Sequence, residues 1–349
     1  MTRSDLAGRR SRACALAVSL LVAVWTCTAG QALAQSRTPL RFGVLPVGDL
    51  VESRRNWEPL WADVGREIGV PVVALSVSNY EALAHAIQRD EVDVAFLPGK
   101  LALDAVSSGQ MSVIAQVKRR DGPPEHQAVL VTRRTPPLNR LDQLLGAPDD
   151  WIMARGPNQS ISGFVVPEAQ LFLPSGIDME TRFRGVIVGT HQETALAVAN
   201  GVADVATNNT TDLERFRLQF PVEAERLQVI WRSQSTPAAQ ILVRSDMQPS
   251  TRRRLRDALT EYGRRAGPAG ATQREVLRAL KASYGYVAAD NSTLQPAAQL
   301  EYEMARQRAL RAQWTSAAAK DARLDRIEKD HARLTALLQS EAAPAPPTR

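Results

Sequence analysis

Two serines separated by a single residue form the most distinctive polar stretch of this sequence. Ser160 and Ser162 lie in NQSISGFVVP (158–167), directly before Gly163 and between an expected strand and an expected helix. The first N–H groups of a helix lack partners and carry partial positive charge, so they attract anions, and serine hydroxyls add donors. Gly163 would let the backbone approach a ligand. A serine that only caps the helix needs no ligand, so the stretch predicts either an anion site or a simple cap.

Four further residues are candidates for the same site because each is expected at the end or start of an element. His191 begins a helix after a strand and could donate to an oxyanion, or could be an exposed loop histidine. Asn208 offers an amide after a strand, although Asn also serves ordinary turns. Tyr80 begins a helix and could supply a phenol or only pack. His126 lies near an expected crossing between domains, where it could reach a ligand or fill a hinge.

Catalytic, metal and nucleic-acid classes are not supported by motifs or charge. The sequence has no Gly-x-Ser-x-Gly elbow, no His-Glu-x-x-His pair and no Walker phosphate loop, so we expect no enzyme, no metal and no cofactor. The chain carries a net charge of +6, of which residues 1–34, with four arginines and one aspartate, contribute +3. The remaining charge is too mild to indicate nucleic-acid binding.

The first 34 residues have the pattern of a cleaved signal peptide. Arginines precede an apolar run over 13–24, and Ala32-Leu33-Ala34 supplies a small-x-small cleavage site. Both cysteines, Cys14 and Cys27, fall inside this segment, so the mature chain has no thiol chemistry. We therefore expect export to the periplasm.

Strands and helices alternate twice along the rest of the chain, which predicts an α/β fold with two lobes, typical of a hinged ligand trap. The expected strands begin with LRFGVLPV, VPVVALSV and VDVAFLPG, and a second series runs from DWIMARG to ADVATNN. The expected divisions are lobe 1 at 38–132 plus 236–290, lobe 2 at 133–235, C-terminal helices at 291–340 and a disordered tail at 341–349. Ligands in such sheets bind beyond the carboxyl ends of the strands, where the candidate loops lie.

Four segments together resemble the periplasmic phosphonate-binding proteins of ABC transporters. They are LRFGVLP, NYEALAHAIQRDEVDVAFLPG, SISGFVVPEAQLF and HQETALAVANGVADVATNNTTDLERF, and the resemblance covers nearly the whole chain after the signal. It implies a two-lobed, hinge-closing periplasmic binding protein without catalysis. It also implies that the phosphonate group is held by Ser160, Ile161, Ser162 and His191, with Tyr80 from the first lobe.

The departures from this family bear on the ligand. Ile161 replaces a threonine, so a hydroxyl is lost while the backbone N–H remains, and Leu97 replaces a second aromatic residue. The two acidic residues that face the ammonium group in aminoalkyl phosphonate binders fall on Thr211 and Ala239. Asp212 is adjacent and could substitute, but a shift by one residue on a helix turns a side chain well away. We therefore expect a phosphonate with an uncharged tail, phosphite or phosphate.

The predicted function is that of a solute-binding component that hands a small oxyanion to an ABC transporter permease. An alternative is a periplasmic binding protein that senses the oxyanion and acts on a signalling receptor. The C-terminal helices could also form a homodimer.

Overall fold

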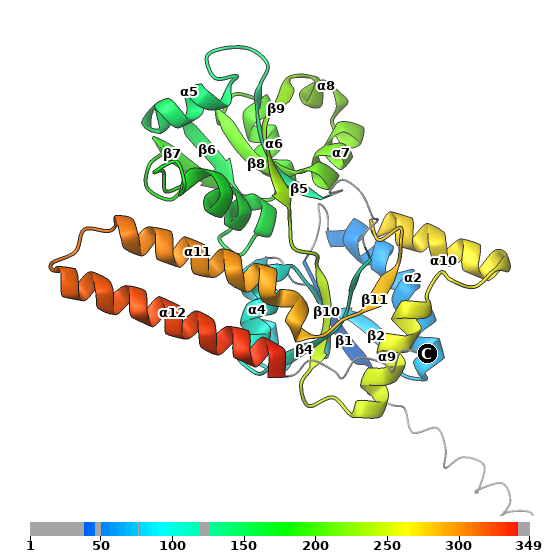
Figure 1. The fold of residues 1–349 in the computed structure, drawn as a ribbon. Coiled ribbons are helices and arrows are strands. Elements are labelled where there is room, and N and C mark those ends of the chain that lie inside the picture. The colour runs from blue at the N-terminus through cyan, green and yellow to red at the C-terminus, as the bar shows by residue number, and fades with distance from the viewer. Residues whose placement is uncertain (1–37, 46–49, 76, 78, 119–125, 341–349) are drawn as a thin grey trace, which may run out of the picture. The chain divides into compact units, whose positions relative to one another are not determined.

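The computed structural model describes residues 38–45, 50–75, 77, 79–118 and 126–340, so the expected signal peptide and C-terminal tail lie outside the described residues. The compact unit of the fold begins at Leu40. It contains two sheets of mixed direction flanked by helices (Figure 1), which confirms the expected α/β class.

The first sheet has the strand order β11-β4-β10-β3-β1-β2. Its strands are β1 (Leu40–Val44), β2 (Val72–Leu75), β3 (Val94–Leu97), β4 (Met111–Val117), β10 (Gln240–Arg244) and β11 (Tyr286–Ala288). β1 pairs in parallel with β2 and β3, whereas β10 runs antiparallel between β3 and β4. The associated helices are α2 (Leu50–Ile68), α3 (Tyr80–Gln88), α4 (Gly99–Ser107), α9 (Pro249–Glu261) and α10 (Gly267–Ala279).

The second sheet has the order β7-β6-β8-β5-β9. Its strands are β5 (Gln127–Arg133), β6 (Ile152–Arg155), β7 (Gly185–Val188), β8 (Val205–Asn209) and β9 (Leu227–Ser235). Its helices are α5 (Leu141–Gly146), α6 (His191–Ala199), α7 (Thr210–Gln219) and α8 (Pro221–Glu225), with a 3₁₀ turn η1 (Pro148–Asp150). Because β5 pairs with β8 and β9, the crossing between the sheets comes before Gln127, whereas the sequence placed residues 127–132 in the first lobe.

An aromatic cluster anchors the core of the first sheet. Phe42 of β1 is fully buried, and its ring centroid lies 4.4 Å from that of Trp61 and 5.0 Å from that of Trp57. Both tryptophans come from α2 at helical spacing, so one face of this helix covers the sheet. Burying each large apolar side chain contributes about 1.5–3 kcal/mol, and together they hold β1 against α2.

The helix expected after β6 is present, but it is not a regular α-helix, because it contains two wide π-helical turns, η2 (Ile161–Val165) and η3 (Glu168–Phe172). Pro167 between them has no N–H and clashes with the carbonyl four residues earlier, which belongs to Gly163. That carbonyl instead accepts hydrogen bonds from the Gly156 N–H at 3.1 Å and the Thr207 hydroxyl at 2.7 Å. The Gly163 carbonyl, which Pro167 leaves without its helical partner, therefore connects the start of this helix to the ends of β6 and β8.

The chain ends in a helical hairpin, α11 (Gln295–Arg311) and α12 (Ala317–Ser340), which follows a short 3₁₀ turn, η4 (Asn291–Leu294) (Figure 1). Leu294 and Ala298 are buried with the helices and strands of the first sheet, whereas Leu300 and Met304 are buried with those of the second. One helix thus contributes to both cores.

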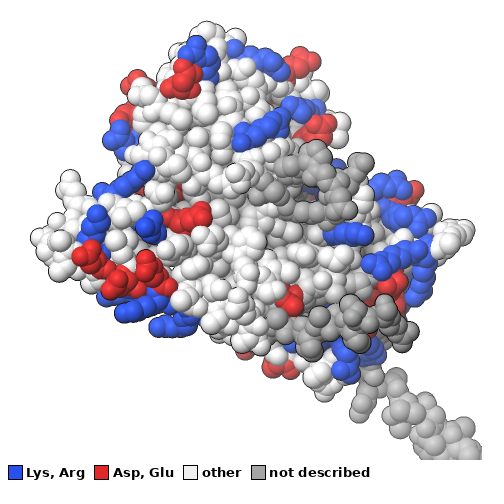
Figure 2. All heavy atoms as spheres, in the orientation of Figure 1, with Lys and Arg blue, Asp and Glu red and all other residues white. Residues whose placement is uncertain are grey.

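Charges of both signs are mixed over much of the surface in Figure 2, with Lys and Arg gathered on the side of α10. Within the described residues, no helix is long and apolar enough to cross a membrane.

Candidate functional site

Three polar side chains from three elements meet at the start of the wide helix. The Ser162 hydroxyl lies 3.0 Å from Nε2 of His191, at the start of α6. It also accepts a hydrogen bond from Nδ2 of Asn209, at the end of β8, at 3.3 Å. The structure therefore brings together Ser162 and His191, both expected at the site, and adds Asn209.

Backbone geometry exposes donors at the same place. Ser160 caps the helix, with its hydroxyl accepting from the Gly163 N–H at 3.1 Å. In the part of the chain that the structure describes, the N–H groups of Ile161 and Ser162 meet no acceptor. Two free N–H groups beside the Ser162 hydroxyl and an imidazole form an arrangement that suits a small oxyanion.

Gly163 lets the start of the wide helix pack closely against the end of β6. A Cβ at this position would lie 2.7 Å from the Ser160 hydroxyl and 2.8 Å from Cα of Gly156. The helix start can approach the end of β6 only because both facing residues are glycines. In the structure, the backbone that approaches Gly163 closely is that of Gly156, directly after β6. The approach of a ligand to Gly163 stays a prediction.

Tyr80 reaches this group from the first sheet's side. It begins α3, which Asn79 caps through a hydrogen bond to the Ala82 N–H at 2.8 Å. Its phenol faces the Ser160 hydroxyl. Burial, together with the nearby Asp212 carboxylate, raises the pKa of Tyr80, while the Ser160 hydroxyl acts in the opposite direction. The phenol is therefore a neutral donor at physiological pH.

His191 is held at the start of α6 by a reciprocal cap. The Thr190 hydroxyl accepts from the Glu193 N–H at 3.2 Å, and the Glu193 carboxylate accepts from the Thr190 N–H at 2.7 Å. Burial lowers the pKa of His191, and the Asp212 carboxylate and the backbone of Thr207 act in the opposite direction. The imidazole is thus neutral near pH 7, and Nε2 can face the ligand as donor or acceptor.

Asp212 lies closer to the site than the sequence predicted. Its carboxylate accepts from Nδ2 of Asn209 at 2.7 Å and pairs with Nη1 of Arg215 at 3.2 Å, and its charge acts on Tyr80 and His191. The prediction that the Asp212 side chain turns away from the site was wrong. Asn209 caps α7, so Asp212 is the third residue of the helix, and its N–H and carboxylate both bond to the Asn209 side chain. The Asn-x-x-Asp pattern carried this signal in the sequence.

Asn208 and Asn209 face different parts of the site. Successive residues of a strand point to opposite faces. The Asn208 amide donates to the carbonyl of His191 at 2.8 Å and accepts from the Asn209 N–H at 2.9 Å, so it supports the start of α6. Asn209, which the sequence reasoning did not select, is the amide that faces Ser162.

Two of the apolar candidates pack away from the polar group. Leu97 is completely buried in the core of the first sheet, so its side chain offers no surface to a ligand. The side chain of Ile161 is buried against the start of α4, where a Cβ on Gly99 would lie 3.1 Å from its Cδ1. At Ile161, only the backbone N–H remains as a donor for the site.

His126 lies where the chain crosses between the sheets. Its Nδ1 is 3.1 Å from the hydroxyl of Thr211 in the first turn of α7. Its carbonyl accepts from the N–H and the hydroxyl of Thr236, on the returning crossing segment, at 3.3 Å and 3.1 Å. The His126 imidazole therefore contacts Thr211, which lies two positions after Asn209 in the sequence.

The described residues contain no cluster of three or more side chains able to hold a metal ion.

Comparison with known proteins agrees with this geometry. The profile of a family described as "ABC transporter, phosphonate, periplasmic substrate-binding protein" matches residues 42–294. The phosphonates-binding periplasmic protein of Escherichia coli is 32% identical over 225 residues, which are 64% of this chain and 66% of that protein. The phosphate-import protein PhnD of Mycolicibacterium smegmatis is 23% identical over 204 residues, which are 56% of this chain and 62% of that protein. The chain thus spans slightly less than two thirds of both relatives.

Solved structures give the same result. A binding protein component of an ABC phosphonate transporter from Pseudomonas aeruginosa superposes with a TM-score of 0.79 at 28% identity, covering 87% of this chain and 99% of that one. PhnD1 of Prochlorococcus marinus, solved with methylphosphonate, shares the fold with a TM-score of 0.65 at 17% identity, covering 76% and 97%. The serine loop, the histidine-led helix and the paired asparagines all fall inside the matched segment, and the chain belongs to the family of periplasmic substrate-binding proteins of phosphonate ABC transporters.

Proposed function

We propose that this protein is the periplasmic solute-binding component of an ABC importer for a phosphonate with an uncharged tail or a related small tetrahedral oxyanion, such as phosphite or phosphate. The observation that carries the proposal is the group of donors at one point: the N–H groups of Ile161 and Ser162, the Ser162 hydroxyl and the amide of Asn209, beside Nε2 of His191. Donors of this kind match oxygen atoms arranged around a phosphorus atom.

The charges around the donors argue against an aminoalkyl phosphonate. Asp212 is the acidic residue coupled to His191 and Tyr80, and its two oxygens are already engaged by Asn209 and Arg215. An ammonium group in this place would lack an unpaired carboxylate. Leaving a charged group without a partner in a desolvated site costs about 1–3 kcal/mol or more.

The proposed cycle is binding without turnover. The signal peptide at 1–34 is removed on export, the oxyanion binds between the two sheets' loops, and the loaded form delivers it to the permease. A homodimer through α11 and α12 is a further proposal, which sedimentation equilibrium of the full mature chain would test.

Isothermal titration of the purified protein against methylphosphonate, phosphite, phosphate and 2-aminoethylphosphonate tests the ligand. We expect one of the first three to bind most tightly. The Ser162→Ala variant shows whether the heat comes from the proposed site, because binding at that site must weaken when the Ser162 hydroxyl is removed. Tightest binding of 2-aminoethylphosphonate would overturn the assignment of the tail, and no binding of any of the four would overturn the function.

A further inference from the structure

We propose that Arg308 of the C-terminal helix α11 is a positioning residue for the oxyanion site, because it holds, through the buried carboxylate of Glu168, the helix whose first residues form that site. This inference rests on the proposed function. Neither residue touches the donors of the site, so their effect on binding is indirect.

The contact between α11 and the wide helix is a buried ion pair. The Glu168 side chain is 0% exposed, and its carboxylate accepts from Nη2 of Arg308 at 2.9 Å and from the Met179 N–H at 3.1 Å. Nε of Arg308 also pairs with Asp178 at 3.1 Å, and Nη2 lies 3.3 Å from Glu180. A guanidinium shared among three carboxylates holds its own position firmly, because its planar fork leaves little freedom.

A second route connects Arg308 to the loop before Ser160. The guanidinium carbon of Arg308 lies 5.8 Å from the centre of the Phe164 ring, and that of Arg155 lies 4.7 Å from it. Nη1 of Arg155 donates to the carbonyl of Gly156 at 2.9 Å and to the side chain of Asn158 at 2.7 Å. Both ends of the loop are therefore restrained by residues that pack around one phenylalanine.

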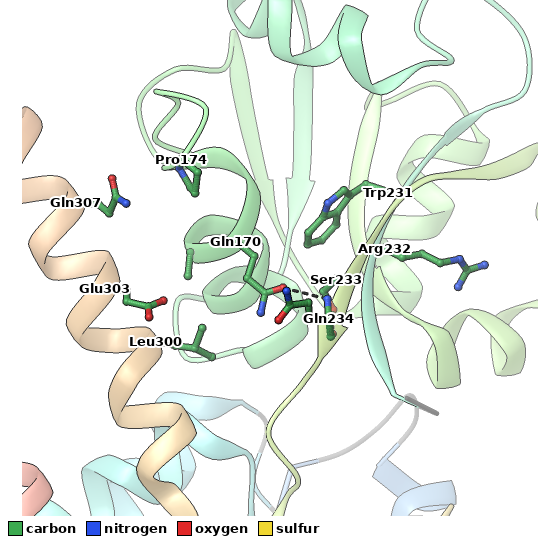
Figure 3. Close-up of a pocket in the computed structure, with 10 residues that line it drawn as sticks. Gln170, Pro174, Trp231, Arg232, Ser233, Gln234, Leu300, Glu303 and Gln307 are labelled. Atoms are coloured by element: carbon green, nitrogen blue, oxygen red, sulfur yellow. Dashed lines mark hydrogen bonds between the residues drawn. The ribbon is translucent and has the colours of Figure 1, made fainter. Parts of the chain in front are cut away.

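A pocket interrupts the apolar packing of α11 against the second sheet. The pocket is open to solvent, has a volume of about 540 Å³ and lies between α11, η3 and β9, with Gln170, Trp231, Leu300 and Glu303 among its lining residues (Figure 3). The ion pairs of Arg308 then make a larger share of the attachment.

The same helix contacts the first sheet's elements at its other end. A Cβ on Gly99, at the start of α4, would lie 3.1 Å from both Ala297 of α11 and Cδ1 of Ile161. Lys100 of α4 pairs with Glu301 of α11 at 3.5 Å. Ile161 is the first residue of the wide helix and supplies a free N–H to the site. α11 is therefore coupled to the wide helix near Ile161 as well as at Glu168.

The test measures the start of the wide helix directly, in the ligand-free mature protein, by hydrogen–deuterium exchange of residues 163–166, whose N–H groups are hydrogen-bonded. We expect Arg308→Met to raise the exchange rate of these amides about tenfold, and to weaken about tenfold the binding of whichever of methylphosphonate, phosphite or phosphate the unmodified protein binds. Arg306→Met is the matched control, because Arg306 lies on the same helix and is exposed. Arg308→Lys keeps the charge without the fork, so it should recover part of both effects.

The outcomes separate positioning from general stability. A lower melting temperature in Arg308→Met with exchange of 163–166 equal to that of Arg306→Met would overturn the inference. If Arg308→Met does not fold, Glu168→Gln and Arg308→Lys decide the question in the same exchange measurement. If the unmodified protein binds none of the anions, the proposed function fails. Hydrogen–deuterium exchange without ligand still decides whether Arg308 positions the start of the wide helix.

Discussion

The hydroxyl of Ser162 lies 3.0 Å from Nε2 of His191, although 29 residues separate them in the chain. Ser162 lies in the first turn of the wide helix after β6 and His191 begins α6, so the starts of two helices bring their polar groups to one place. Removing the hydroxyl should weaken oxyanion binding, because a hydrogen bond to a charged group contributes about 1.5–3 kcal/mol, or about 10- to 100-fold in affinity. Titration of Ser162→Ala against the tightest-binding anion checks this, with the exposed Ser107→Ala as control. Equal affinities in the two variants would refute the role of Ser162.

Binding should be accompanied by proton uptake at His191. Burial lowers the pKa of this imidazole in the free protein, and a bound anion raises it, so a proton is taken up and affinity falls as pH rises. Titrations near neutral pH in two buffers of different ionisation enthalpy measure the uptake. His191→Asn should lose the imidazole's part of it, while any uptake by the anion itself remains. Identical uptake in both proteins would contradict this.

The two neighbouring asparagines should separate stability from binding. Asn208→Ala removes the support of the His191 carbonyl, leaving buried polar groups without partners at a cost of about 1–3 kcal/mol. Asn209→Ala removes the amide that faces Ser162 and should lower affinity more than it lowers the melting temperature, although its cap on α7 is also lost. Thermal melts and titrations of both variants check this. The reverse ranking would place Asn208 at the ligand.

Gly163→Ala should be strongly destabilising. Its Cβ would come within 2.8 Å of the Gly156 backbone, which cannot move as a flexible side chain would. Overpacking of this kind costs about 1–3 kcal/mol. Gly146→Ala is the matched control, because a Cβ there meets nothing within 4 Å. Urea unfolding compares the two, and equal stability would mean that the helix start does not need the close approach.

Glu168 should make stability depend on pH in the unusual direction for a carboxyl group. Burial, with the nearby charge of Asp178, raises the pKa of Glu168 from 4.5 to about 7, despite Arg308 and the Met179 N–H. Between these values the folded state binds a proton that the unfolded state has released, so stability falls as pH rises from about 4.5 to about 7. The full effect is at most about 3 kcal/mol. Melting temperatures of the unmodified protein and of Glu168→Gln across this range check it, and parallel curves would speak against the raised pKa.

Much of the fold was predictable because periodicity and helix signals are local. The apolar strands, the helix stops and the polar residues at strand ends in the sequence predict an α/β protein with an anion site at NQSISGFVVP. The same reasoning could not place β5, because a strand at the crossing between sheets has the same apolar pattern whichever sheet it joins. It also expected an ordinary helix after Ser160, since Pro167 predicts a distortion without saying which groups take over the freed carbonyl.

What the sequence determined by itself is which residue types are available at each helix start: Ser160 and Ser162, His191, and the Asn-x-x-Asp cap at Asn209. Only the tertiary structure decided which of them face one another, because that depends on strand order and on alternation along β8. It turned Asn209 rather than Asn208 toward Ser162, and it placed the side chain of Ile161 against Gly99 instead of among the donors. It also joined Arg308 to Glu168 across 140 residues of chain, a contact between charges that no local pattern specifies.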